Sequence, residues 1–264
     1  MIYLGTSGYG YDNWKSVYYP AGLSRGERLA FYSAEFDAVE LNFTYYRMPK
    51  ADHLSRMAAQ TPHDFRFAVK AHQDITHNRR QDPAPFAQFR AALAPLQRQG
   101  KLGAVLLQFP YAFRNVEENV RYLQYCYEQL PDLPLVVEFR RSDWLSQRTL
   151  DLLREWVVGF CNVDMPELRG LVPRTAFVTA PTAYVRLHGR NAQKWWKHDQ
   201  AWERYNYLYS EEELVEWIPH LQDLGGQAEN LFVFANNHWN GQSVSAIRQL
   251  KMLLGGQGDA SKVG

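Results

Sequence analysis

Two of the most apolar stretches of the chain each carry an acidic residue in the middle or at the end. In DAVELNF (residues 37–43), Glu40 and Asn42 alternate with apolar residues, and PLVVEF (residues 134–139) contains Glu138. Alternation with a period of two is typical of a β-strand with two different faces. Two carboxylates brought to one site would provide the acid and the base of glycoside hydrolysis.

Cations occupy equivalent positions in neighbouring stretches. Lys70 ends FRFAVK, Arg140 follows Glu138 by two residues, and AYVRLH provides Arg186 and His188. The planar guanidinium group of arginine matches the oxygens of a phosphate or a carboxylate, and histidine can move a proton near neutral pH. These residue types therefore favour a site for an anionic ligand.

The two interpretations predict different states of the carboxylates. Arginine or lysine beside Glu40 and Glu138 would lower their pKa values and keep them ionised, which argues against a glycosidase-type general acid. We therefore favour an enzyme of the hydrolase or lyase type that acts on a phosphate- or carboxylate-bearing substrate, nucleic-acid fragments included. A glycoside-processing enzyme is retained as an alternative.

The elements that must position these residues alternate along the chain. Eight short β-rich runs are separated mostly by amphipathic segments, which predicts parallel strands joined by right-handed helical crossovers. An open doubly wound sheet shares this rhythm, but eight units in 264 residues favour a single-domain (β/α)8 TIM barrel with outer helices over residues 1–255. The expected strands span residues 2–6, 37–43, 65–70, 103–108, 134–139, 157–164, 183–188 and 231–236, and the expected helices span residues 25–35, 50–60, 85–98, 116–128, 147–156, 211–224 and 243–254.

In such a barrel, the polar residues that alternate with apolar ones should all point to the same side of the sheet. The apolar face of each strand should meet the helices, and the other face should meet the lumen. Each polar residue lies near the carboxyl end of its strand, where barrel enzymes carry their active sites. A buried ion-pair network that closes the core, with Glu40 paired to Lys70 and Glu138 to Arg140 or Arg186, is the structural alternative.

Seven motifs, in order over nearly the whole chain, resemble the YecE-like proteins, also called domain of unknown function 72. They are GTSGYGYDNWKSVYYP (5–20), VELNFTYYRMP (39–49), FRFAVKAHQDITH (65–77), LGAVLLQFP (102–110), VEFRRSDW (137–144), AYVRLHGR (183–190) and NNHWNG (236–241). The resemblance implies a TIM barrel and brings no established reaction. Two positions depart from the pattern, with Arg141 where histidine is expected and Ala246 where asparagine is expected.

We assign roles on this basis. The predicted catalytic residues are Glu40, Lys70, Glu138 and His188. The predicted substrate-binding residues are Ser7, Tyr11, Asn42, Tyr45, His77, Gln108, Arg140, Asp164, Arg186, Arg190, Asn236 and Asn237.

Aromatic residues in the expected loops offer a different function. KWWKHDQAWERYNYLY (194–209) combines rings with Lys194, Lys197 and Arg204, as single-stranded nucleic-acid platforms do. A non-catalytic module that binds nucleic acid or a protein partner through these loops is therefore the second hypothesis.

No cofactor is expected. His188, Glu138, Glu40 and Asp164 could be ligands of a divalent metal, but the neighbouring cations argue against it.

Composition narrows the remaining choices. The formal net charge of +1 gives no bulk attraction to a polyanion or to a membrane surface, so the expected partner is a small anionic ligand or a nucleic-acid fragment. Cys126 and Cys161 are too few and too far apart for a disulfide scaffold. We expect cytoplasmic residence, no membrane span and a flexible tail at residues 256–264, while the sequence leaves the oligomeric state open.

Overall fold

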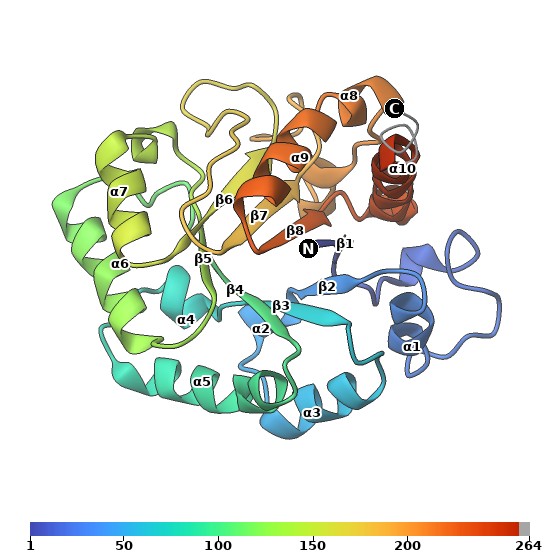
Figure 1. Cartoon of the computed structure of the whole chain (residues 1–264), viewed down its shortest axis with the longest axis horizontal. Helices are drawn as coiled ribbons and strands as arrows, with labels where there is room; N and C mark the ends of the chain where they lie inside the picture. Colours follow the sequence, from blue (N-terminus) through green and yellow to red (C-terminus); the bar gives the residue numbers. More distant parts are fainter. Residues whose placement is uncertain (259–264) are drawn as a thin grey trace.

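The computed structural model describes residues 1–258 and contains a closed barrel in which eight parallel strands follow one another in sequence order (Figure 1). This confirms the TIM barrel. The strands are β1 (Ile2–Ser7), β2 (Ala38–Leu41), β3 (Arg66–Lys70), β4 (Leu102–Gln108), β5 (Leu135–Glu138), β6 (Gly159–Asp164), β7 (Thr182–Leu187) and β8 (Asn230–Ala235).

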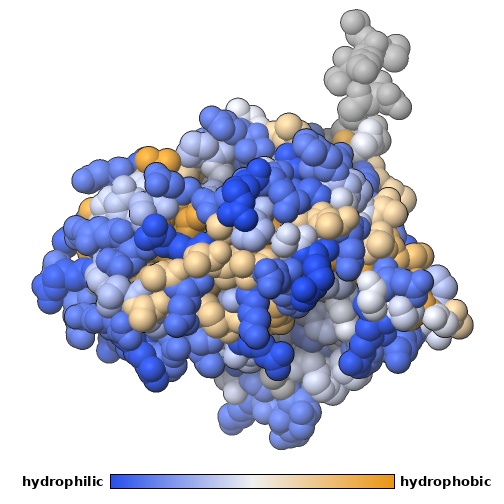
Figure 2. All heavy atoms as spheres, turned by 90° about the horizontal axis from the view of Figure 1, so that it is seen from below, coloured by the Kyte–Doolittle hydropathy of each residue, from blue (hydrophilic) through white to orange (hydrophobic). Residues whose placement is uncertain are grey.

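Helices surround the strands in Figure 1 and cover their apolar faces. They are α1 (Arg28–Ser33), α2 (Phe43–Tyr46), α3 (Ala51–Ala59), α4 (Gln73–Thr76), α5 (Pro83–Arg98), α6 (Glu117–Gln129), α7 (Gln147–Glu155), α8 (Glu211–Val215), α9 (Ile218–Gln227) and α10 (Gln242–Gly258). Short 3-10 turns lie at Asp12–Trp14, Ser142–Trp144, Ala201–Tyr205 and Trp239–Gly241. The side of the barrel seen in Figure 2 is mostly hydrophilic, as expected for a solvent-facing layer of helices.

Two predicted elements differ from the structure for identifiable reasons. The helix expected over residues 211–224 is two helices, because Pro219 lacks an N–H and instead lies at the start of α9. The strand expected over residues 37–43 ends at Leu41, and Phe43 begins the single turn of α2. This early turn is functionally relevant because it brings Tyr45 and Tyr46 to the carboxyl end of the barrel.

Aromatic side chains fill the lower part of the lumen. Phe232 and Phe234 of β8 lie with their ring centroids 6.3 and 5.3 Å from that of Tyr184 on β7. Across the barrel, Gly103 of β4 leaves the space that Phe232 occupies, since a Cβ at Gly103 would lie 2.4 Å from a carbon of that ring. The barrel is therefore a packed core below its mouth.

The connection between β6 and β7, residues 165–181, contains no helix. Hydrogen bonds made by polar side chains of the barrel and of the connection hold it instead. Oδ1 of buried Asn162 accepts hydrogen bonds from the Phe177 N–H (2.8 Å) and the Thr175 hydroxyl (2.9 Å), and the Thr179 hydroxyl accepts one from the Phe160 N–H (2.8 Å). These bonds replace the helix packing found in the other crossovers.

The C-terminal helix extends further than expected. α10 continues to Gly258, so the first three residues of the predicted tail are helical, and residues 259–264 lie outside the described residues.

Candidate functional site

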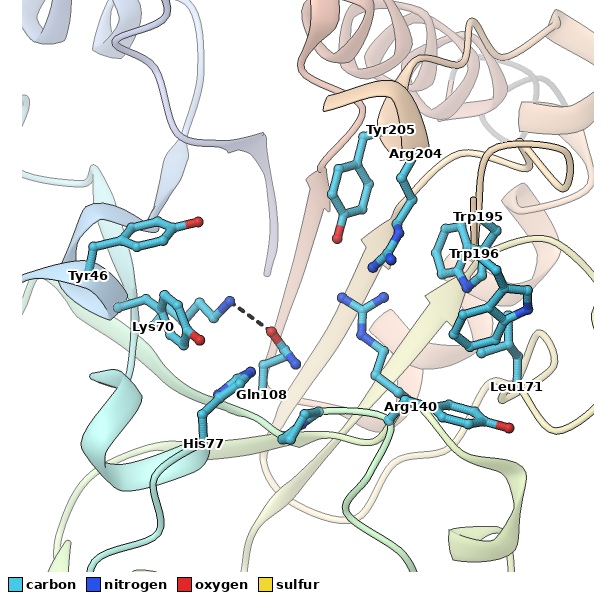
Figure 3. Close-up of a pocket in the computed structure, with 13 residues that line it drawn as sticks. Tyr46, Lys70, His77, Gln108, Arg140, Leu171, Trp195, Trp196, Arg204 and Tyr205 are labelled. Carbon is cyan, nitrogen blue, oxygen red and sulfur yellow. Dashed lines mark hydrogen bonds between the residues drawn. The ribbon is translucent and has the colours of Figure 1, made fainter. Parts of the chain in front are cut away.

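Two adjoining cavities lie at the carboxyl ends of the strands, with volumes of about 290 and 410 Å³. The residues that line both are Tyr46, Lys70, Gln108, Arg140 and Tyr205. Figure 3 shows the first cavity, in which Lys70, Gln108 and Arg140 project from the ends of their strands, while Arg204 and Tyr205 approach from the loop after β7. We call the combined space the mouth.

A buried ion-pair network lies beneath the mouth, and we call it the floor. Of its members, Arg186 lines the second cavity, whereas Glu40, Glu138 and Tyr184 line neither cavity. Arg186 of β7 donates from Nη2 to Oε1 of Glu40 (2.7 Å) and from Nη1 to Oε2 of Glu138 (2.5 Å). The hydroxyl of Tyr184 donates to the other oxygen of Glu40 (2.7 Å). All four side chains are almost completely buried. Glu40 is therefore paired with Arg186 and Tyr184 and not with Lys70, the partner expected from the sequence.

Glu138 receives a second cation from its own strand end. Nε of Arg140 lies 2.7 Å from Oε1 of Glu138. Burial by itself would raise the pKa of Glu138, but the charges of Arg140 and Arg186 overcome this effect and hold the pKa well below its usual value. Glu138 is thus a permanently ionised partner for two arginines and cannot act as a general acid near neutral pH.

His188 follows β7 and is fully buried beside the same carboxylate. Its Nε2 lies 3.3 Å from Oε1 of Glu138, and its Nδ1 lies 3.0 Å from the side-chain amide nitrogen of Asn236. Burial, aided by the charge of Arg140, lowers the pKa of His188 to about 3. The ring is therefore neutral, and the partners assign its proton to Nε2 with Nδ1 as an acceptor.

Lys70 ends β3 and points into the mouth (Figure 3). Its Nζ donates to Oε1 of Gln108 (2.8 Å) and lies 4.5 Å from the ring centroid of Tyr45. Burial, with the repulsion of Arg186, lowers the pKa of Lys70 to about 7. Near neutral pH a large fraction of this amine is therefore uncharged.

Two further arginines face each other at the wall of the mouth. In Figure 3 the guanidinium groups of Arg140 and Arg204 point toward one another. Each also lies over the ring of buried Trp195, at 6.0 Å for Arg140 and 5.4 Å for Arg204. Nη1 of Arg140 and Nε of Arg204 are buried and have no hydrogen-bond partner in residues 1–258.

The predicted substrate-binding residues divide into three groups, of which the third, Asp164 and Arg190, forms a separate cluster. Tyr11, Asn42, Tyr45, His77 and Asn236 line the mouth together with Gln108, Arg140 and Arg186. Burial, together with Lys70, lowers the pKa of His77 to about 4, so this ring is also neutral. Ser7 and Asn237 are buried but line neither cavity, and the amide nitrogen of Asn237 donates to the backbone oxygen of Tyr207 (2.8 Å).

Asp164 and Arg190 lie in a separate cluster. Asp164 accepts hydrogen bonds from Arg190 (2.8 Å), from the Tyr209 hydroxyl (2.9 Å) and from the Trp217 indole (2.6 Å). These partners come from the chain after β7, and neither Asp164 nor Arg190 lines the mouth. The contacts indicate that this pair anchors the loop between β7 and α9 to the barrel.

The aromatic loop after β7 is largely engaged within the protein. Trp195 is buried, Trp202 stacks on Trp239 with ring centroids 3.7 Å apart, and Lys194 pairs with Glu203 at 2.8 Å. Trp196 is the exposed ring of this group, at 48% exposure. The surface available for stacking bases is thus smaller than the sequence suggested. Arg204 and Tyr205, which the sequence placed in the nucleic-acid platform and not in the anionic site, line the mouth.

Comparisons with known proteins decide the family. The sequence model described as "Protein of unknown function DUF72" matches residues 3–263. The chain belongs to the DUF72 family. This confirms the resemblance to the YecE-like proteins that the motifs carry.

The similar proteins of known sequence or structure cover either most of the chain or a little under half of it. UPF0759 protein YunF of Bacillus subtilis is 36% identical, covering 96% of this chain and 95% of its own. UPF0759 protein YecE of Escherichia coli K12 is 30% identical over 43% of this chain and 39% of its own. The crystal structure of the DUF72 protein TM1631 of Thermotoga maritima has a TM-score of 0.90 and 37% identity, over 97% of this chain and 99% of that chain. EF0366 of Enterococcus faecalis, another DUF72 protein, has a TM-score of 0.87 and 26% identity, over 97% of this chain and 96% of that chain.

Two kinds of feature are absent from residues 1–258. No group of three or more His, Cys, Asp and Glu side chains is arranged there to hold a metal ion. In the same residues, no helix has both the length and the apolar character needed to cross a bilayer.

Proposed function

We propose that this DUF72 protein is an enzyme of the hydrolase or lyase type that binds a small anionic substrate, bearing a phosphate or carboxylate group, in the mouth of the barrel. The observation that carries the proposal is the pair of guanidinium groups of Arg140 and Arg204, which face each other with unpaired N–H groups above Trp195. Two like charges in this arrangement repel, and an anion between them would remove the repulsion and satisfy the donors.

The charge balance of the mouth supports this proposal. Glu40 and Glu138 are matched by Arg186 and Arg140. Within residues 1–258, neither Lys70 nor Arg204 forms an ion pair. The mouth therefore carries an excess of positive charge although the whole chain is nearly neutral.

The titratable side chains in the mouth also favour catalysis over binding alone. Lys70 has a pKa of about 7, which is the range in which a side chain can both accept and donate a proton. Perturbed titratable groups in a cleft at the carboxyl ends of barrel strands are typical of active sites. His188, which is neutral and buried, serves in this proposal to position Glu138 rather than to carry a proton.

The binding part is tested by the effect of inorganic phosphate on thermal unfolding. With 10 mM phosphate we expect the Tm to rise by about 2–4 °C, the effect of a site with a dissociation constant of about 1 mM. Arg204→Gln should abolish most of this rise. The matched control is Arg148→Gln, an exposed arginine on α7 paired with Glu117, which should keep it.

Sulfate and citrate extend the test to other anions at matched ionic strength. A Tm of the unmodified protein that does not respond to any of the three anions would refute the anionic site. An equal response in Arg204→Gln and in the unmodified protein would show that the anion binds elsewhere.

A further inference from the structure

Lys70 differs from an ordinary buried lysine in how its amine is held. Buried Lys101 donates to three oxygens at the end of α3, those of the Ala58 carbonyl (2.7 Å), the Thr61 carbonyl (2.8 Å) and the Thr61 hydroxyl (2.9 Å). All three donors of the Lys101 ammonium are thus used. The amine of Lys70 has the single hydrogen-bond acceptor Gln108 in residues 1–258, and it faces open space in both cavities.

The surroundings of Lys70 favour the uncharged amine. Burial is the main cause, and no carboxylate in residues 1–258 forms an ion pair with Nζ. Arg186 and Arg140 oppose a charge on the amine, and the charges of Glu138 and Glu40 offset part of this repulsion. The ring of Tyr45 covers one side of the amine at 4.5 Å. A lysine that is desolvated and placed beside other cations is an activated nucleophile toward carbonyl compounds.

The position of Lys70 relative to the arginines defines what it can meet. Lys70 lies on one side of the first cavity, and Arg140 and Arg204 lie on the other (Figure 3). A substrate whose anionic group is bound between the two arginines would extend across the cavity toward Nζ. The group that reacts with an amine at that end is an aldehyde or a ketone.

We propose that Lys70 forms a Schiff base with the carbonyl group of a substrate whose phosphate or carboxylate is held by Arg140 and Arg204. This inference rests on the proposed function, since it uses the same anionic site. The substrate class is therefore an anionic aldehyde or ketone, and the reaction type narrows to a lyase or a related amine-catalysed step.

The Schiff base forms by addition of the amine followed by loss of water. The lone pair of the neutral amine forms a bond to the carbonyl carbon, the C=O π electrons move to oxygen, and a proton passes from nitrogen to that oxygen. The resulting hydroxyl group takes one proton from solvent and leaves as water, while the nitrogen forms the C=N bond and remains protonated. The positive iminium nitrogen can then accept the electron pair of a bond that breaks next to the former carbonyl carbon.

The test uses pyridoxal phosphate as a probe that has both an aldehyde and a phosphate group. The full-length protein is incubated with the probe, reduced with borohydride and digested, and the modified lysine is located by mass spectrometry. We expect Lys70 to gain the mass of the probe less one oxygen atom, at an initial rate at least tenfold above that of exposed Lys50 on the unmodified chain. The rate at Lys70 should rise with pH through about 7, and 10 mM inorganic phosphate should reduce it several-fold.

Matched reagents and variants separate this inference from the proposed function. Pyridoxal, which lacks the phosphate, should label Lys70 much more slowly, and Arg204→Gln should remove the difference between the two probes. Peptide mapping of the unmodified protein needs no variant to fold, and Lys70→Met serves as a blank, with Lys50→Met as its control.

Absence of preferential labelling at Lys70, in protein whose Tm still rises with phosphate, would overturn the Schiff base and leave the anionic site standing. Equal labelling of Lys70 by pyridoxal and pyridoxal phosphate, with no protection by phosphate, would support the reactive amine and refute the anionic site. Labelling spread evenly over exposed lysines would refute the reactive amine.

Discussion

Arg186 of β7 is bonded to Glu40 of β2 across the lumen, with 2.7 Å between Nη2 and Oε1. These strands are not neighbours in the barrel, so the bond links parts of the sheet that share no backbone hydrogen bonds. Tyr184 occupies the second oxygen of Glu40. The carboxylate inside this apolar strand therefore holds Arg186 in place, and each of its oxygens already accepts one hydrogen bond.

Glu40→Gln is expected to destabilise the protein by about 3–5 kcal/mol, because Arg186 would keep a buried charge that Glu138 alone must balance. The urea midpoint of unfolding measures the change. The control is Asp151→Asn, which removes an exposed ion pair with Arg154 and should change the free energy of unfolding by less than about 1 kcal/mol. Similar losses of unfolding free energy for the two substitutions would contradict a stabilising role of the buried ion pairs.

Lys70→Met is expected to stabilise the protein most strongly at acidic pH. The pKa of Lys70 is about 7 in the folded state and 10.5 in its unperturbed state, so the folded protein bears the full cost of the buried charge below pH 7. Between pH 7 and about 10 the unfolded chain binds more protons, and the unmodified protein gains stability with rising pH.

The gain in the free energy of unfolding should therefore be about 4 kcal/mol larger at pH 6 than at pH 10, since each unit of pKa shift corresponds to about 1.4 kcal/mol. Urea unfolding of both proteins over this range is the measurement. A constant difference at every pH would show that the amine is not desolvated.

Gly103→Ala is expected to destabilise the barrel by about 1–3 kcal/mol, because the added methyl would lie 2.4 Å from the ring of Phe232. Phe232→Leu in the same chain should recover part of the loss. Gly226→Ala on α9 is the matched control, since no atom lies within 4 Å of its added methyl, and it should stabilise by about 0.5–1 kcal/mol. Additive effects of Gly103→Ala and Phe232→Leu would count against direct contact.

Trp195 and Trp196 should differ sharply although they are adjacent. Trp195 is 1% exposed and supports both arginines of the wall, whereas Trp196 is 48% exposed. We expect Trp195→Ala to lower the free energy of unfolding by about 3–5 kcal/mol and Trp196→Ala by less than about 1 kcal/mol. Phosphate should still raise the Tm of Trp196→Ala. Loss of that response would favour the alternative hypothesis that the aromatic loop after β7 binds the ligand.

The repeating parts of this fold could be read from the sequence. Alternation placed Glu40, Lys70, Glu138 and Arg186 in the lumen, and the structure has them there, because a strand residue's face depends only on its position within the strand. The same rule would have placed Asp164 correctly, since it shares the face of Phe160, whose ring packs with Phe177 outside the lumen. Asp164 was assigned to the predicted site because it lies at the carboxyl end of its strand.

The irregular parts could not be read in this way. Arg204 and Tyr205 reach the mouth from a long loop whose path depends on tertiary contacts, such as those of Asp164 with Tyr209 and Trp217. Packing also determines the turn of α2. It likewise determines that Glu40 pairs with Arg186 and not with the predicted Lys70. Residue type and spacing along the chain carry no signal for choices of this kind.

The floor and the wall of the mouth have different origins in the chain. The floor is built from Glu40, Glu138 and Arg186 on three strands, and replacing any one of them disturbs the other two. The wall near Arg204 belongs to one connection between β7 and α8, which can change in length or composition while the strands stay fixed. Mutations in this connection would therefore change the lining of the mouth, while Lys70 at the end of β3 keeps its place.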